Sequence, residues 1–161
     1  MKLTKKTFAF PLLAVLAAGV ALSGSAHAAA DGQQLYNANC SLCHQVGGAG
    51  VPGMYPTLKG RIGTIASSAE GKTYVMHVLL NGLSGTIKAG GNSYTGYMPS
   101  FVAQTDENVA AILTYVASLG DAKPAPTFTA DDVKAARAAG TLAPAAILDE
   151  RKKLDAVHPI P

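Results

Sequence analysis

Residues 40–44 read Cys-Ser-Leu-Cys-His, and this run constrains the chain more than any other feature. A C-x-x-C-H run is typical of sites where haem is attached to a polypeptide. Two thiols form thioethers with the vinyl groups of one porphyrin, and the following histidine gives the iron a nitrogen ligand. We therefore predict one haem c bound covalently through Cys40 and Cys43, with His44 as a ligand of the iron. A sulfur ligand on the other side of the iron would suit it to moving single electrons.

Two other chemistries use a C-x-x-C pair, namely thioredoxin-like redox sites and zinc sites. A zinc site of this kind needs a second pair of cysteines or histidines. The chain has no cysteine beyond Cys40 and Cys43 and offers no such second pair. A thioredoxin-like site lies in a strand–helix–strand context, whereas the flanks of this motif are helical and glycine-rich in pattern. Haem attachment therefore fits the surrounding sequence best.

The beginning of the chain has the pattern of an export signal. Lys2, Lys5 and Lys6 form a basic start, an apolar stretch covers residues 8–22, and Ala26-His27-Ala28 matches an A-x-A cleavage site. We predict a signal peptide over residues 1–28, cleavage after Ala28 and a periplasmic location, where bacteria attach haem c. The apolar stretch is short for a bilayer span, so no stable membrane insertion is expected after cleavage. An uncleaved signal that stays as an anchor is the alternative.

The signal also accounts for the positive charge of the sequence. The full chain has a formal net charge of +3, and the signal contains three lysines and no acidic residue. The remainder is therefore neutral and has no basic patch. This balance gives no support for a nucleic-acid partner.

The rest of the chain alternates helical patterns with glycine-rich segments. Helices are predicted over residues 31–40, 67–80 and 105–119, of which the last has its apolar residues at helical spacing and Thr105 as its N-cap. The segments 45–60 and 82–100 are rich in glycine or proline and are predicted to be loops. The prediction is an all-α protein with three main helices.

A boundary follows Gly120. Lys123-Pro124-Ala125-Pro126 is typical of a stiff linker. Two short helices are predicted beyond it, over residues 129–140 and from Pro144 to about Asp155. We therefore divide the chain into the signal, a domain over residues 29–120, and a linker with a helical tail over residues 121–161. The tail either wraps around its own domain or docks on a partner protein.

Residues 31–120 resemble the class I monohaem cytochromes c. Gly32 and Tyr36 match a glycine and an aromatic residue of the family's first helix, and Tyr115 matches the aromatic residue of its last helix. Pro56 stands where the family has a proline after the haem motif. The resemblance implies the cytochrome c fold around a covalently attached haem, with the Gly32–Tyr36 face crossing the last helix.

The resemblance also implies the surroundings of the iron. The carbonyl of Pro56 is expected to accept a hydrogen bond from the second ring nitrogen of His44, with Pro52 as the rival. Met98, followed by Pro99 at the end of a glycine-rich segment, matches the ligand loop of the family and is expected to bind the iron through sulfur. The less favoured residues are Met54, Met76, His77 and His158.

Apolar residues near these positions are candidates for the wall of a haem pocket. They are Leu58, Val75, Leu79, Ile87, Phe101, Ile112 and Leu113. Arg61 and Lys59 are candidate partners of the haem propionates, and Tyr94 could add a hydroxyl.

These features predict a periplasmic one-electron carrier without catalytic residues. Its partners would be a redox donor and acceptor, such as a periplasmic dehydrogenase or a terminal oxidase. The alternative is a cytochrome c subunit that stays docked, through its tail, on a periplasmic dehydrogenase or oxidase complex. A haem protein with an open ligand position for peroxide or small ligands would require that Met98 does not bind the iron.

Overall fold

The computed structural model describes residues 32–161, so the predicted signal peptide and the cleavage after Ala28 lie outside the described residues. The first described element is a helix over residues 32–39. It is followed by α2 (Ser41–His44), the 3-10 helix η1 (Val46–Gly48), α3 (Ile62–Ile65), α4 (Ala69–Asn81), β1 (Leu83–Ala89), β2 (Asn92–Met98), α5 (Asp106–Ser118), α6 (Ala130–Ala138) and α7 (Pro144–Val157).

Side-chain caps begin three of the long helices. Ser68 accepts a hydrogen bond from the backbone N–H of Gly71 at the start of α4, and Thr105 accepts one from Asn108 N at the start of α5. Thr129 and Asp132 form a reciprocal capping box at the start of α6. Each cap satisfies N–H groups that have no partner within the helix. The helices predicted at these positions are confirmed.

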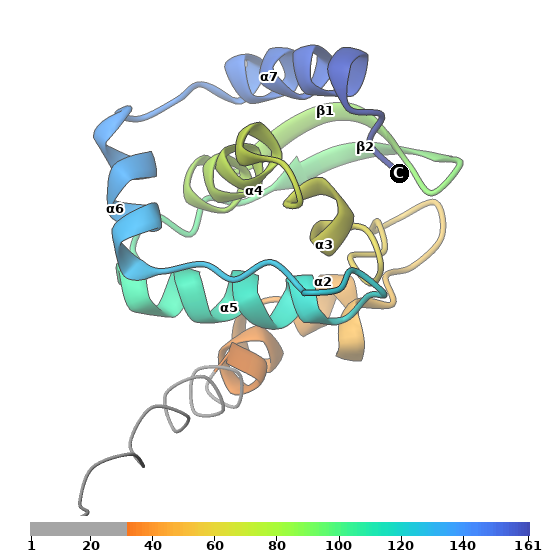
Figure 1. The fold of residues 1–161 in the computed structure, drawn as a ribbon. Coiled ribbons are helices and arrows are strands. Elements are labelled where there is room, and N and C mark those ends of the chain that lie inside the picture. The colour runs from red at the N-terminus through yellow and green to blue at the C-terminus, as the bar shows by residue number, and fades with distance from the viewer. Residues whose placement is uncertain (1–31) are drawn as a thin grey trace, which may run out of the picture.

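The first helix crosses α5 at close range (Figure 1). A Cβ atom on Gly32 would lie 2.2 Å from Ala111 O, so only glycine allows this approach. One turn later, the ring of Tyr36 lies 5.4 Å from the ring of Tyr115 on α5, centroid to centroid, at an interplanar angle of 51°. The crossing expected from the resemblance is thereby confirmed.

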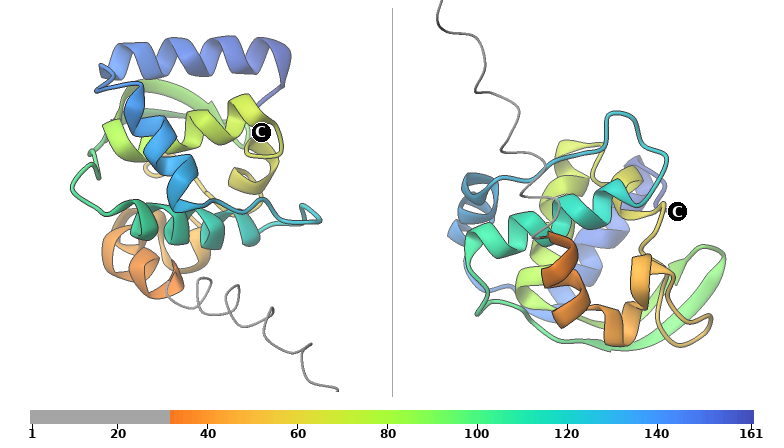
Figure 2. Two further views of the ribbon diagram at one scale, coloured as in Figure 1. Left: turned by 60° about the vertical axis from the view of Figure 1, so that its left-hand side comes forward. Right: turned by 90° about the horizontal axis from the view of Figure 1, so that it is seen from below.

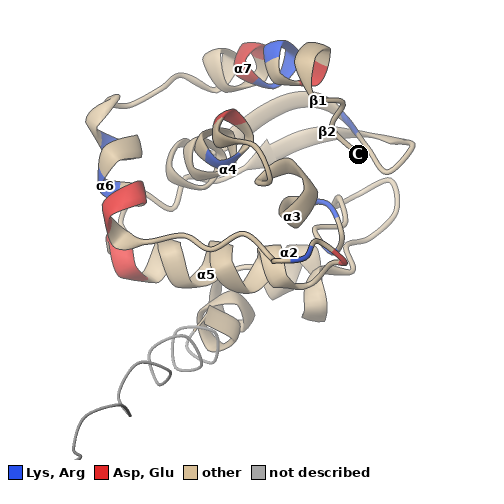
Figure 3. Cartoon of the chain, viewed as in Figure 1, with Lys and Arg blue, Asp and Glu red and all other residues tan. Residues whose placement is uncertain are grey.

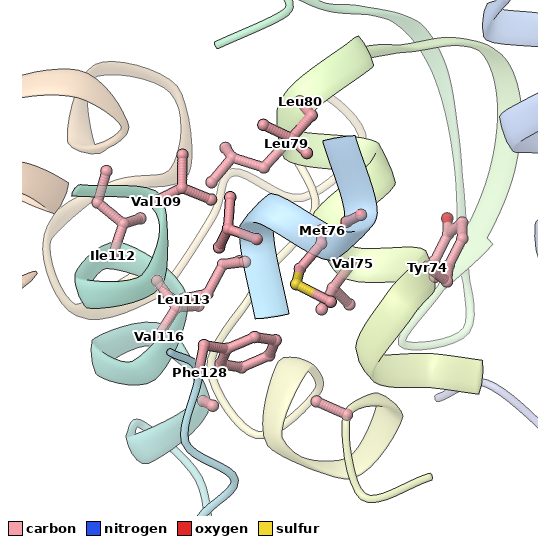
Figure 4. Close-up of a cluster of buried hydrophobic side chains, with 14 of the residues drawn as sticks. Tyr74, Val75, Met76, Leu79, Leu80, Val109, Ile112, Leu113, Val116 and Phe128 are labelled. Atoms are coloured by element: carbon pink, nitrogen blue, oxygen red, sulfur yellow. The ribbon is translucent and has the colours of Figure 1, made fainter. Parts of the chain in front are cut away.

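A buried apolar cluster joins α4, α5 and the tail. Figure 4 shows residues of α4 such as Leu79 and Met76 facing residues of α5 such as Val109 and Val116, with Phe128 between the segments. All of these side chains are buried. The burial follows from the helical spacing of apolar residues in the two helices.

The segment over residues 82–100, which we predicted to be a loop, is a β-hairpin. β1 and β2 pair antiparallel with Ala89 opposite Asn92, and Gly90 and Gly91 form the turn with φ angles of 55° and 79°. Two residues with positive φ are typical of the turn type that matches the twist of a hairpin. The glycines therefore mark the turn of a sheet, and the fold is mostly helical with one small hairpin.

The tail folds back on the rest of the chain. α6 contacts α5 and α4, and α7 contacts β1 and α4, so α7 lies across the hairpin in two of the views (Figures 1 and 2). Val133 and Ile147 are completely buried, and Leu154 is 7% exposed. Both predicted tail helices are present, and their apolar faces are covered by the chain itself.

None of the helices within residues 32–161 combines the length and the apolar character needed to cross a membrane. Acidic residues gather at the first turns of α5 and α6, and α7 carries charges of both signs (Figure 3).

Candidate cofactor site

A cavity with apolar walls lies between α4, α5 and the loop after the C-x-x-C-H motif. It has a volume of about 100 Å³, and Cys40, His44, Pro56 and Met98 line it. Its aliphatic lining consists of Leu58, Ile62, Ile65, Val75, Val78, Leu79, Leu83, Ile87, Ile112, Leu113 and Val116.

Helix α2 sets the spacing of the two cysteines. The N–H groups of Cys43 and His44 both donate to Cys40 O, at 3.2 and 2.9 Å. Cys40 is buried and lines the cavity, whereas Cys43 is half-buried and does not line it. Burial, assisted by the nearby Cys43, raises the pKa of the Cys40 thiol to about 11.

His44 is oriented by one hydrogen bond. Its Nδ1 lies 2.9 Å from Pro56 O, and a carbonyl can only accept, so Nδ1 carries the proton. Burial lowers the pKa of the imidazole, although the bond to Pro56 opposes this shift and the charge of Arg61 adds to it. The ring is therefore held neutral, which is the form that binds a metal, and Nε2 is the nitrogen available to a metal.

The loop after the motif folds over itself to bring Pro56 to His44. Gly50 N donates to His44 O at 2.8 Å, and a Cβ on Gly50 would lie 2.7 Å from the carbonyl carbon of Pro56. Gly50 also has a φ of 69°, so both the close approach and the backbone conformation require glycine there. Pro52, the rival candidate, is exposed in the same loop.

Met98 ends strand β2 and is held close to the end of α4. A Cβ on Gly82 would lie 2.5 Å from Met98 O. Beyond Met98, the Oγ of Ser100 donates to Leu80 O at 2.5 Å and Phe101 N donates to Leu79 O at 2.9 Å. These contacts tie the segment after Met98 to the helix whose residues line the cavity.

The competing ligand candidates lie elsewhere. Met54 is 64% exposed and Met76 is 5% exposed within the apolar cluster, and neither lines the cavity. His77 is buried, but its Nδ1 lies 2.9 Å from Glu150 Oε2 on α7. His158 is exposed at the end of α7. Met98 is thus the methionine of the described chain that lines the cavity.

Six of the seven predicted wall residues line the cavity, and Phe101 does not. Phe101 packs against the apolar core instead. Among the polar candidates, Arg61 lines the cavity, whereas Lys59 and Tyr94 do not. Arg151 and Tyr74 also line it and were missed, because no local pattern connects a tail arginine with a distant motif.

The described side chains fit a covalently bound porphyrin better than the alternatives. Within residues 32–161, no group of three or more His, Cys, Asp or Glu side chains could hold a metal ion by itself, so a zinc site finds no ligand set. The motif lies between helices rather than in a strand–helix–strand unit. An apolar cavity with a cysteine and a neutral histidine in its wall matches the donor chemistry of haem c.

Comparison with known proteins agrees with this site. Residues 29–120 match the family described as cytochrome c. The chain is 44% identical to a cytochrome c-552 of Thermus thermophilus over 143 residues, which cover 86% of this chain and 95% of that relative. It is 34% identical to the fructose dehydrogenase cytochrome subunit of Gluconobacter japonicus over 122 residues, which cover 73% of this chain and 24% of that relative.

The family match and the Cys40–Cys43 pair together mean that the protein carries covalent haem c. The long alignment with cytochrome c-552 extends beyond residues 29–120 and so includes part of the tail. The chain belongs to the cytochrome c family, whose members carry electrons.

Proposed function

We propose that the protein is a periplasmic one-electron carrier whose haem iron is bound by His44 and Met98. The observation that carries this proposal is that Cys40, His44, Pro56 and Met98 all line one apolar cavity. Residues 29–120 would form the haem-binding unit. Residues 121–161 would be a linker and helical extension folded on that unit.

Each residue has a distinct task in this proposal. Haem c, when bound, supplies an iron centre that gains and loses single electrons. Cys40 and Cys43 anchor it covalently, and Pro56 O fixes the ring orientation and tautomer of His44. The thioether of Met98 favours the reduced state relative to a second nitrogen ligand. The aliphatic walls exclude water and keep the local dielectric low.

If His44 and Met98 both bound the iron, no position would be left for a substrate, so no catalytic residue is proposed. The partners would be redox proteins: a donor and an acceptor such as a periplasmic dehydrogenase or a terminal oxidase. In the view of Figure 3 the charges are few and of mixed sign. Weak electrostatic steering toward such partners is expected.

A second candidate function is a cytochrome subunit of a dehydrogenase or oxidase complex. The name of the Gluconobacter japonicus relative, a fructose dehydrogenase cytochrome subunit, favours this class. Docking through the buried faces of α6 and α7 would require Val133 and Ile147 to leave the core. A permanent partner would therefore have to use another surface. Co-purification of the exported protein with a larger enzyme would favour the complex over the free carrier.

The ligand assignment is tested with Met98→Ala in the haem-loaded protein. The variant should lose the weak red-region band of a methionine–iron bond, and its reduced form should bind carbon monoxide. Met98→His should stay six-coordinate and low-spin with a lower midpoint potential. Met54→Ala and Met76→Leu are the matched controls and should keep the spectrum. A wild-type spectrum and potential in Met98→Ala would exclude Met98 as the ligand.

The location is tested by mass analysis of the protein from the periplasmic fraction. The mature chain should begin at Ala29. A chain that keeps residues 1–28 and sediments with membranes would replace the free carrier by a membrane-anchored one.

A further inference from the structure

A guanidinium from the C-terminal helix reaches the proposed haem cavity. Arg151 of α7 lines this cavity together with Arg61. Both side chains belong to buried residues, with exposed fractions of 9% for Arg151 and 6% for Arg61. Arg61 lies within the part of the chain that matches the family, residues 29–120, and Arg151 lies outside it. One arginine from residues 29–120 and one from the tail therefore line the same cavity.

The partners of Arg151 are neutral. Its Nη2 donates to Lys88 O at 2.5 Å, and its Nη1 donates to Tyr74 Oη at 3.4 Å. Burial raises the pKa of Tyr74, although the hydrogen bond from Arg151 opposes this shift, so the phenol is neutral. The neighbouring Glu150 directs its carboxylate to His77 instead. Among the residues that the structure describes, Arg151 thus has no acidic partner where it reaches the cavity.

Arg61 has acceptors of its own and, being a cation, does not neutralise Arg151. It donates to Thr57 O at 2.9 Å and to an oxygen of Pro161 at 2.5 Å. Within residues 32–161, neither arginine forms an ion pair with an Asp or Glu side chain. Burial, with a further contribution from the charge of Arg151, lowers the pKa of Arg61 to about 10. Arg151, a buried cation that is also repelled by Arg61, would be stabilised by an anion within the cavity.

The packing of α7 fixes where Arg151 lies. Ile147, Arg151 and Leu154 follow one another at helical spacing on one face of α7, and all three are buried. Leu148 packs onto the hairpin so closely that a Cβ on Gly85 would lie 2.7 Å from its Cδ1. The packing of the whole helix, together with the hydrogen bonds of the guanidinium, therefore holds Arg151 toward the cavity.

We infer that Arg151 binds a propionate carboxylate of haem c, so that the C-terminal extension is part of the cofactor site and raises the reduction potential. This inference rests on the proposed function, because it requires the haem to occupy this cavity. Haem c carries two propionates, and the planar fork of an arginine matches a carboxylate. A nearby cation disfavours the oxidised haem, which carries one more positive charge than the reduced haem.

The test compares Arg151→Gln with Lys153→Gln in the full-length, haem-loaded protein. Lys153 lies on the same helix, is exposed and does not line the cavity. Its substitution removes the same single positive charge, but at a place outside the cavity. Arg151→Gln should shift the midpoint potential to a more negative value, and the shift should persist in high salt because buried charges are screened little. Lys153→Gln should leave the potential at the wild-type value. Equal potentials for the two variants would overturn the inference.

A second measurement does not depend on the removal of the charge. Arg151→Lys keeps the cation but loses the planar fork, and it should change the propionate bands in the resonance Raman spectrum of the haem. Unchanged propionate bands would also overturn the inference. The weak red-region absorption band of the methionine–iron bond tells whether only this inference fails or the proposed function fails as well. If only the inference is wrong, that band stays present in the wild-type protein and in every Arg151 variant.

Discussion

Gly32 and Ala111 bring the first described helix and α5 into backbone contact, because a Cβ on Gly32 would lie 2.2 Å from Ala111 O. The nearby ring contact between Tyr36 and Tyr115 depends on the same crossing. Tyr36 in turn donates from its hydroxyl to Gln45 O at 2.7 Å, directly after the haem motif. The crossing therefore helps to hold the motif in place.

Gly32→Ala should lower the free energy of unfolding by at least about 1–3 kcal/mol, because overpacking against backbone forces the helices apart. Chemical denaturation of the haem-loaded protein measures the loss. Gly96→Ala is the control, because a Cβ there would meet no atom within 4 Å. Equal stabilities of the two variants would contradict the account of the crossing.

Ile147→Ala should destabilise the protein by about 2–5 kcal/mol, the usual cost of truncating a fully buried aliphatic side chain. Ile147 is 0% exposed within α7. Val157→Ala, at a position 72% exposed on the same helix, should change stability by less than about 0.5 kcal/mol. Thermal unfolding of both variants is the measurement. An Ile147→Ala protein as stable as wild type would mean that the tail does not wrap its own domain in solution.

Arg137→Gln should loosen the segment that follows Met98. Arg137 of α6 donates to Asp106 Oδ1 at 2.6 Å, to Val102 O at 2.8 Å and to Gln104 O at 2.5 Å. Loss of these charge-assisted bonds should lower the free energy of unfolding by roughly 1–3 kcal/mol. Faster hydrogen exchange in residues 99–105 should accompany this loss. Lys134→Gln, an exposed change on α6, is the control and should leave that exchange unchanged.

The Lys72–Asp132 pair should make stability depend on pH on the acid side. Lys72 Nζ lies 2.7 Å from Asp132 Oδ2, and this bond lowers the pKa of Asp132 below its usual 3.8. The stabilisation of the folded state by this pair is fully present above 3.8, the pKa of Asp132 in the unfolded chain. It is lost as the pH falls through the lower pKa that Asp132 has in the folded protein. Asp132→Asn should therefore be less stable than wild type at neutral pH, and the difference should shrink in acid.

Denaturant titrations at several pH values measure this difference. Asp131→Asn makes the same charge change at an exposed neighbouring residue and should lack the effect. The stability difference between wild type and Asp132→Asn could instead stay constant from neutral pH to well below 3.8. That result would contradict the dependence of stability on the ionisation of Asp132.

Some features of the fold and site depend on neighbouring residues alone and were therefore predictable. The caps at Ser68, Thr105 and Thr129 act within one helical turn, and the helices that they begin lie where the sequence predicts them. The C-x-x-C-H run is likewise local, and its presence agrees with the family match over residues 29–120. Glycine content was misleading for the hairpin, since strand pairing there depends on the partner strand rather than on local composition.

The sequence by itself determined the attachment chemistry, the capped helices and the short list of sulfur ligands, because each depends on residue type and spacing along the chain. Only the tertiary structure decided which residues share the cavity. Met98 lines it while Met54 and Met76 do not, and Arg151 reaches it from α7. These placements result from the packing of helices far apart in sequence, where burial of apolar faces, and not local propensity, fixes the side chains in space.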